Sequence, residues 1–95
     1  MFLLSKFKIR GHSMEPLFKD GEKALASFIP YLISKPKVKD VVIFKVKGKY
    51  FVKRVRDIKN GKYFVEGDNK KDSLDSKNLG KISNQEIVAK VIYKL

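Results

Sequence analysis

The sequence predicts one small all-β domain, spanning residues 1–95, with a coiled or barrel-like antiparallel sheet of about six strands. Three observations predict this class. Short segments alternate apolar and polar residues with the period of two that is typical of strands. Turn signals such as Asn60-Gly61 separate these segments at short intervals. The chain has 95 residues, 43% of them hydrophobic, which suits one domain with a modest core.

The elements are expected in the following order. Strands are predicted at residues 4–9, 22–29, 40–46, 49–58, 62–66 and 87–93. The third and fourth strands form a hairpin around Lys47-Gly48, and Asn60-Gly61, the strongest hairpin signal in the chain, joins the fourth to the fifth. Residues 30–39 and 67–80 are expected to be loops, and residues 82–86 a single turn.

The composition bounds the possible partners and cofactors. The net charge is +12, with 22 Lys and Arg against 10 Asp and Glu, a balance that favours nucleic acid, anionic lipid or acidic proteins. The lysines are dispersed along every segment instead of clustered with stacking aromatics, so nucleic acid is not expected as the partner. With no cysteine and one histidine, a zinc site is not expected either, and we predict catalysis without a metal or cofactor.

The N-terminal apolar run is too short for a membrane span. It begins at Met1 and ends before Ser5, whereas a span needs about 20 apolar residues and a secretory signal at least about seven. The predicted location is therefore either the cytoplasm or the surface of a membrane. At a membrane surface Phe2, Leu3 and Leu4 would contact lipid, although we favour the interpretation that these residues begin a strand.

A turn near the N-terminus carries the first candidate catalytic group. Residues 11–16 read Gly-His-Ser-Met-Glu-Pro, and the flanking Gly and Pro allow a sharp bend that leaves the Ser13 hydroxyl exposed. A serine hydroxyl is a poor nucleophile unless a base lies beside it. His12 is adjacent in sequence, but neighbouring side chains of an extended chain point to opposite faces. Without another base, Ser13 is an ordinary turn residue.

Lys53 is the candidate base. The alternation in the fourth predicted strand places Lys53 on the same face as Phe51 and Val55. Burial among apolar neighbours disfavours the charged form of a lysine, and a neutral amine can act as general base toward a serine hydroxyl. The alternative is an ordinary strand lysine, with a buried stem and a solvated head.

A third segment, residues 67–77, is polar and rich in turn residues. Together with residues 11–16 and the Lys-Arg-Val sequence at 53–55, it resembles the serine–lysine type I signal peptidases. Those enzymes carry a Gly-x-Ser-Met-x-Pro segment, a Lys-Arg-Val segment and a Gly-Asp-Asn…Ser-x-Asp-Ser-Arg segment in the same order. The likeness extends over nearly the whole chain. It implies a signal-peptidase fold, related to that of LexA, and a Ser/Lys serine endopeptidase.

The resemblance also assigns roles to individual residues. Ser13 would attack the scissile carbonyl, and Lys53 would take the proton of Ser13 and later activate water. Ser73 matches the family serine that hydrogen-bonds the lysine. Asp75 matches an acidic residue that pairs with the basic residue two positions on, here Lys77 where the family commonly has Arg.

The remaining motif residues have supporting roles. Gly11 occupies the place where some relatives have a serine that stabilises the oxyanion, so this contribution would come from the Ser13 backbone N–H. Met14 and Asp68 belong to the same motifs, and Asp68 taken alone would be an Asx turn residue.

The resemblance implies a precursor protein with small residues before the cleavage site as the substrate. The short layout of this chain resembles that of the maturation proteases of nickel-type superoxide dismutase, so that enzyme is one possible precursor. Three alternatives remain: a LexA-type self-cleaving domain, a non-catalytic relative, and a basic β-barrel that binds nucleic acid. In the last case four aromatic residues would stack on bases: Tyr50, Phe51, Tyr63 and Phe64. Their alternation with apolar positions favours the core instead.

Overall fold

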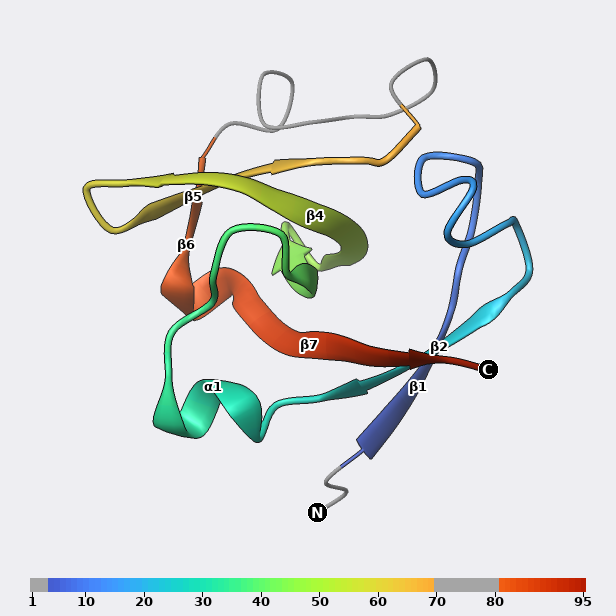
Figure 1. The fold of residues 1–95 in the computed structure, drawn as a ribbon, viewed down its shortest axis with the longest axis horizontal. Coiled ribbons are helices and arrows are strands. Elements are labelled where there is room, and N and C mark those ends of the chain that lie inside the picture. The colour runs from blue at the N-terminus through green and yellow to red at the C-terminus, as the bar shows by residue number, and fades with distance from the viewer. Residues whose placement is uncertain (1–3, 70–80) are drawn as a thin grey trace.

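The computed structural model describes residues 4–69 and 81–95, and it confirms the all-β class (Figure 1). The strands are β1 (Leu4–Lys8), β2 (Lys23–Ser27), β3 (Val41–Val46), β4 (Lys49–Lys59), β5 (Lys62–Glu66), β6 (Ile82–Ser83) and β7 (Ile87–Lys94). They are accompanied by one short α-helix, α1 (Pro30–Ile33), and one 3-10 turn, η1 (Asn84–Glu86). The six predicted strands are all present, with ends that differ by a few residues.

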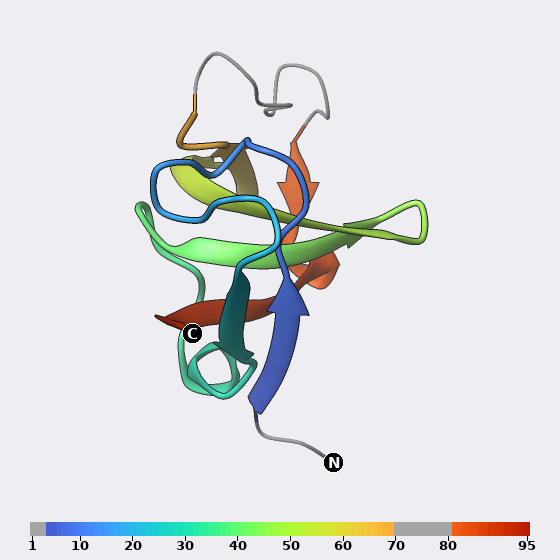
Figure 2. The ribbon, with the colours of Figure 1, turned by 90° about the vertical axis from the view of Figure 1, so that its right-hand side faces the viewer.

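The strands form one antiparallel sheet in the order β1-β2-β7-β3-β4-β5-β6. The sheet coils strongly, so that β4 and β5 lie at one end of the molecule and β1 and β2 cross β7 toward the other (Figures 1 and 2). Within the described residues β1 and β6 are its two edges and do not pair with each other. The sheet is therefore open and coiled and does not close into a barrel.

Two predicted elements differ from the structure. Residues 30–39 are not a loop throughout, because they begin with α1; Pro30 suits the first turn of a helix, where its missing N–H is not needed. Residues 82–86 contain the predicted turn as η1, but Ile82 and Ser83 first pair with β5 and add a seventh strand. Within the described residues no helix has the length and apolarity needed to cross a bilayer.

The core consists of three contiguous clusters. One lies between β3, β4, β5 and β6; its buried members are Val42, Phe44, Val55, Tyr63, Val65 and Ile82. The second lies beneath the Ser13 turn and contains Ile9, Met14, Phe18, Ala24 and Val41. The third, around Ala26, Ile43 and Ala89, joins β2, β3 and β7. The second cluster matters most for function, because it attaches the Ser13 turn to the sheet.

Candidate active site

The Ser13 turn follows β1 and is held to the sheet by two fully buried side chains. Met14 and Phe18 are each only 1% exposed, so both ends of the turn are anchored in the core while Ser13 stays half-buried. Gly11 opens the turn with a φ of +82°, a conformation that residues with a side chain rarely adopt. The Gly11 N–H donates to Asp20 Oδ1 at 2.7 Å, which closes the loop on itself.

Lys53 lies in β4, where it pairs with Val42 of β3. Its side chain is 3% exposed, although lysine is almost never fully buried without a reason. Val55 on the same face is fully buried and Phe51 is half-buried, so the apolar surroundings predicted from the alternation are confirmed. Such surroundings favour the neutral form of an amine over its charged form.

Ser13 and Lys53 line the same cleft, between the end of β1, the Ser13 turn and β4. Its volume is about 140 Å³, and the lining residues are Phe7, Lys8, Ile9, Arg10, Ser13, Met14, Tyr50, Phe51, Val52 and Lys53. Pockets for drug-sized ligands measure about 300–1,000 Å³, so this cleft suits a short side chain. The structure thus brings together a hydroxyl and a buried amine that are forty residues apart in the sequence.

The segment after β5 contacts the Ser13 turn directly. The backbone N–H of Asn69 donates to the carbonyl oxygen of Ser13 at 2.8 Å. The Asn69 side chain donates through Nδ2 to the carbonyl oxygen of His12 at 3.0 Å, across 57 residues of sequence. Asn69 belongs to the Gly-Asp-Asn motif at residues 67–69, and the motif alone does not indicate a role for its side chain. Its position between Asp68 and the polar segment was the available signal.

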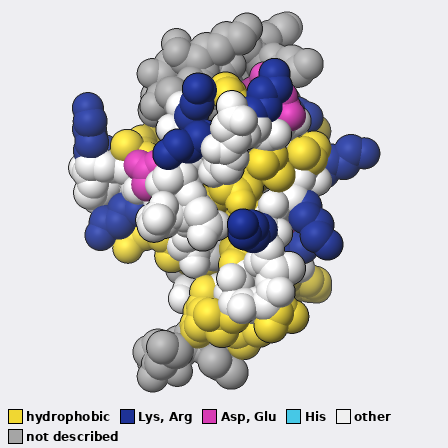
Figure 3. All heavy atoms as spheres, turned by 90° about the vertical axis from the view of Figure 1, so that its left-hand side faces the viewer, with side chains coloured by type: hydrophobic (Ala, Val, Ile, Leu, Met, Phe, Trp, Pro, Cys, Tyr) yellow, Lys and Arg dark blue, Asp and Glu magenta, His cyan; other side chains and the backbone are white. Residues whose placement is uncertain are grey.

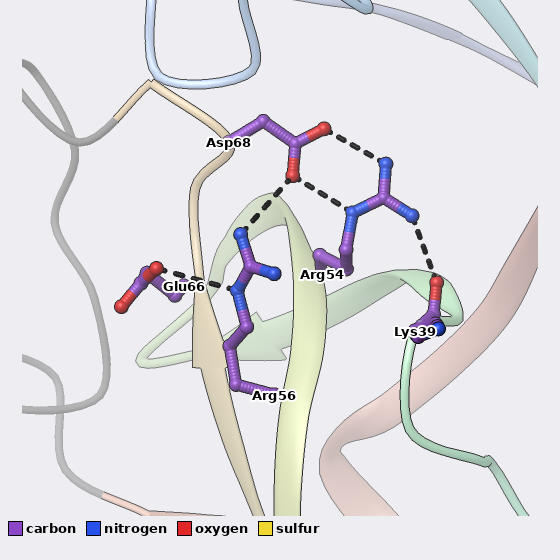
Figure 4. A network of polar contacts seen from close by, with 5 residues as sticks. All are labelled: Lys39, Arg54, Arg56, Glu66 and Asp68. Carbon is purple, nitrogen blue, oxygen red and sulfur yellow. Dashed lines mark hydrogen bonds and ion pairs between the residues drawn. The ribbon is translucent and has the colours of Figure 1, made fainter.

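Asp68 is bound by Arg54 on the face of β4 opposite Lys53 (Figure 4). Arg54 Nε donates to Asp68 Oδ1 and Arg54 Nη2 to Asp68 Oδ2, both at 2.8 Å, while Arg54 Nη1 donates to the Lys39 carbonyl at 2.9 Å. Arg56 adds weaker contacts to Asp68 Oδ1 at 3.7 Å and to Glu66 Oε1 at 3.3 Å. Asp68 is therefore more than a turn residue, and its partner Arg54 was not predicted from the sequence.

This network shifts the ionisation of both main partners. The hydrogen bonds from Arg54 hold the pKa of Asp68 below its ordinary value. The same hydrogen bonds raise the pKa of Arg54 above its ordinary value. Both groups stay charged at neutral pH, and bidentate geometry of this kind is among the strongest polar contacts in proteins.

His12 takes no place in the cleft. Its Nδ1 atom lies 2.6 Å from Glu15 Oε2 within the turn, and His12 is not among the residues that line the cleft. Ser73, Asp75 and Lys77, which the resemblance placed around the dyad, lie outside the described residues. In residues 4–69 and 81–95, no group of three or more His, Cys, Asp or Glu side chains is arranged to hold a metal ion.

Comparison with known families bears on this arrangement. The family model for signal peptidase, peptidase S26, matches residues 1–56 and 54–95, which together span the whole chain. The chain belongs to the peptidase S26 family. This is a family of serine peptidases that act on precursor proteins, and membership supports a peptidase activity for the chain.

Individual relatives agree with the family match. The chain is 26% identical over 149 residues to signal peptidase IB of Staphylococcus aureus strains Mu50 and N315, with 98% of this chain and 78% of the relative covered. Signal peptidase IB of strain COL is 25% identical over the same length. Since the alignment is longer than this chain, the relatives contain inserted residues that the chain lacks.

Proposed function

We propose that the chain is a Ser/Lys-dyad endopeptidase that removes an N-terminal signal or propeptide from a precursor protein. The observation that carries this proposal is the shared cleft of Ser13 and the buried Lys53. A serine hydroxyl needs an adjacent base, and a lysine among apolar side chains can supply one. The S26 family match supports the same reaction class.

In the proposed reaction, Ser13 is the nucleophile and Lys53 is the general base and then the general acid. As Ser13 Oγ attacks the scissile carbonyl carbon, its proton passes to the neutral Nζ of Lys53. The resulting ammonium group protonates the leaving amine, and an acyl-enzyme on Ser13 remains. Lys53, neutral again, takes a proton from water as the water oxygen attacks the ester carbonyl. The ammonium group of Lys53 then returns this proton to Ser13 Oγ, which leaves as the hydroxyl while the acid product is released. The backbone N–H of Ser13 would donate to the oxyanion in both steps.

The turn geometry supports this division of roles. A nucleophile must be held in place to within a fraction of an ångström, because misplacement by about 1 Å can cost a hundredfold in rate. The buried side chain of Met14 anchors the turn in the core, and Asn69 donates hydrogen bonds to the carbonyl oxygens of His12 and Ser13. Gly11 provides the bend through its positive φ, which a residue with a side chain rarely adopts.

The size of the cleft indicates which class of precursor it accepts. The small volume of the cleft favours precursors with short side chains before the scissile bond. Maturation of a nickel-type superoxide dismutase stays a prediction from the resemblance. A nickel superoxide dismutase gene beside the gene for this chain would support it.

Association with a membrane surface also stays a prediction. Residues 1–3 lie outside the described part, but α1 exposes Leu32 by 70% and Ile33 by 87%. Figure 3 shows hydrophobic side chains gathered at the lower end of the molecule, and residues 23–39, which include α1, contain no Asp or Glu. An apolar tip on a basic segment suits an anionic lipid surface. Co-sedimentation with phosphatidylglycerol vesicles, compared with Leu32→Ser, measures this association.

The alternative functions have weaker support. Of the four aromatic residues that would stack on bases, Tyr63 is buried in the core, Phe51 and Phe64 are half-buried, and only Tyr50 is largely exposed. A stacking surface needs several exposed rings along one path. LexA-type self-cleaving domains use the same kind of Ser/Lys dyad, but the family model that matches this chain is that of the signal peptidases.

Active-site acylation tests the proposal. A penem inhibitor that acylates catalytic serines should add one adduct to the protein, and mass spectrometry should locate that adduct on Ser13. Ser13→Ala should stay unmodified, whereas Ser5→Ala, which removes an exposed serine of β1, should label like the parent protein. Equal labelling of Ser13→Ala and the parent would show that Ser13 is not the nucleophile.

A further inference from the structure

The lining of the active-site cleft is strongly asymmetric in charge. Three of its residues are basic, namely Lys8, Arg10 and Lys53, and none of the lining residues is acidic. Lys53 is buried and belongs to the proposed reaction, whereas Lys8 and Arg10, which also line the cleft, are exposed to solvent. The lining of the cleft therefore includes two solvent-accessible positive charges.

The ion pairs among the described residues do not involve these two cations. Within the described residues neither Lys8 nor Arg10 forms an ion pair, although several other basic residues, such as Arg54, Lys90 and Lys94, do. Two carboxylates of the segment between β1 and β2 are bound within that segment: Glu15 contacts His12, and Asp20 accepts a hydrogen bond from the Gly11 N–H. Exposed cations that line a cleft concentrate anionic groups there.

From this arrangement we infer that the cleft selects precursors with acidic residues close to the cleavage site, and that Lys8 and Arg10 determine this specificity. The inference rests on the proposed peptidase function and adds a substrate class to it. Lys8 ends β1 and Arg10 follows two residues later. Because alternate residues of an extended chain share a face about 7 Å apart, a matching peptide carries two carboxylates at alternate positions.

The expected size of the preference follows from the exposure of the two cations. A solvent-exposed ion pair changes an equilibrium by roughly one- to fivefold, so two pairs should favour an acidic peptide about three- to tenfold. Exposed charges are screened by salt, with a Debye length of about 10 Å at 0.1 M and about 3 Å at 1 M. The preference should therefore decline steeply as salt is added, which a preference based on shape would not do.

The test uses matched peptides with alanine before the scissile bond and either two Glu or two Gln residues at alternate positions. Sets with these residues before or after the cut cover both sides of the cleft. The measured quantity is the ratio of kcat/KM for the Glu and Gln peptides at 0.05 M and 0.5 M NaCl. We expect a three- to tenfold ratio at low salt in one of the two sets, falling below about twofold at high salt.

Two double variants with the same change in net charge separate the cleft from the general field. Lys8→Glu/Arg10→Glu should reverse the ratio toward the Gln peptide. Lys35→Glu/Lys62→Glu alters two exposed lysines that do not line the cleft, and it should keep the ratio of the parent within twofold. An equal fall in both double variants would assign the preference to overall charge and overturn the inference.

Binding measurements keep the inference testable even if no peptide is cleaved. Fluorescence anisotropy of labelled Glu and Gln peptides with Ser13→Ala should show the same three- to tenfold preference without turnover. If the protein binds the Glu peptide more tightly but the parent cleaves neither peptide, the peptidase proposal is contradicted and the preference for acidic ligands is supported. Equal binding of the two peptides would overturn the inference. Competition with a single-stranded oligonucleotide is the second check. If the oligonucleotide displaced the labelled Glu peptide at a lower concentration than unlabelled Glu peptide does, nucleic acid would be the favoured ligand and the inference would be overturned.

Discussion

The two faces of β4 use neighbouring basic residues in opposite ways. Lys53 is 3% exposed and faces the cleft and the apolar core. The side chain of Arg54, next in sequence, is 25% exposed and is bound to Asp68 on the other face. Because an arginine in a protein does not lose its proton, it suits a permanent ion pair, whereas a lysine in apolar surroundings can become neutral. The comparison shows how a strand separates a chemical role from a structural one.

The two faces are connected through the segment that follows β5. Asp68 is held by Arg54, and the next residue, Asn69, donates to the carbonyl oxygens of Ser13 and His12. The ion pair on one face of β4 therefore positions the turn that carries the proposed nucleophile, while the other face carries the proposed base. Substitutions of Lys53, of the Arg54–Asp68 pair and of Asn69 test this division.

The largest effect is expected on the cleft face. Lys53→Arg keeps the charge but cannot supply a neutral base, so kcat/KM should fall by about 10²–10⁴. In the parent protein activity should rise with pH, because only the neutral amine of Lys53 accepts the proton of Ser13. Cleavage of a peptide with small residues before the scissile bond measures both effects, and thermal unfolding checks the fold.

Two exposed lysines on the same hairpins provide the controls for Lys53. Lys49→Ala and Lys62→Ala should stay within about twofold of the parent in kcat/KM, because neither lines the cleft. A folded Lys53→Arg protein with undiminished activity would rule out the Ser/Lys mechanism.

The next effect is expected on the ion-pair face. Arg54→Met leaves the partly buried carboxylate of Asp68 without its bidentate partner and should lower the free energy of unfolding by about 1–3 kcal/mol. For a domain of this size the loss lowers Tm by about 4–8 °C per kcal/mol. Asp68→Asn should lower the free energy of unfolding by a similar amount. The double variant should lose less free energy of unfolding than the sum of the two single losses. Additive losses would show that the pair contributes no coupling energy.

The ion pair also predicts how stability depends on pH. Since Arg54 lowers the pKa of Asp68 from its ordinary value of 3.8, the contribution of the pair is fully present above about pH 4. It is lost as the pH falls through the lower pKa of the folded state. Urea unfolding of the parent between pH 5 and about 2 should therefore show a steeper loss of stability than Asp68→Asn. Equal pH dependence in both proteins would contradict this assignment.

The smallest effect is expected where the two faces meet. Asn69→Ala removes the hydrogen bond to the His12 carbonyl but keeps the backbone bond to Ser13, so stability should fall by only about 1 kcal/mol. Because the Ser13 turn loses part of its support, kcat should fall about tenfold with KM changed by less than about threefold. Asn84→Ala, in η1, provides the matched control. A larger effect on KM than on kcat would assign Asn69 to substrate binding instead of positioning.

Much of this arrangement was determined by the sequence alone. The period of two in residues 49–58 placed Lys53 with Phe51 and Val55, and the Asn60-Gly61 turn joined β4 to β5. Both are local features, because side-chain direction along a strand and the shape of a two-residue turn depend on neighbouring residues. The order of the three motifs likewise indicated the signal peptidase family, which the family match bears out.

Only the tertiary structure decided which distant groups meet. Alternation places Arg54 opposite Lys53 but does not say that Asp68 binds it, and no local pattern shows that Asn69 reaches His12 across 57 residues. The seventh strand and the open edge of β1 depend in the same way on how the sheet coils. These contacts form because burial of Met14, Phe18 and Val55 brings remote segments together, and burial is a property of the packed molecule rather than of any segment.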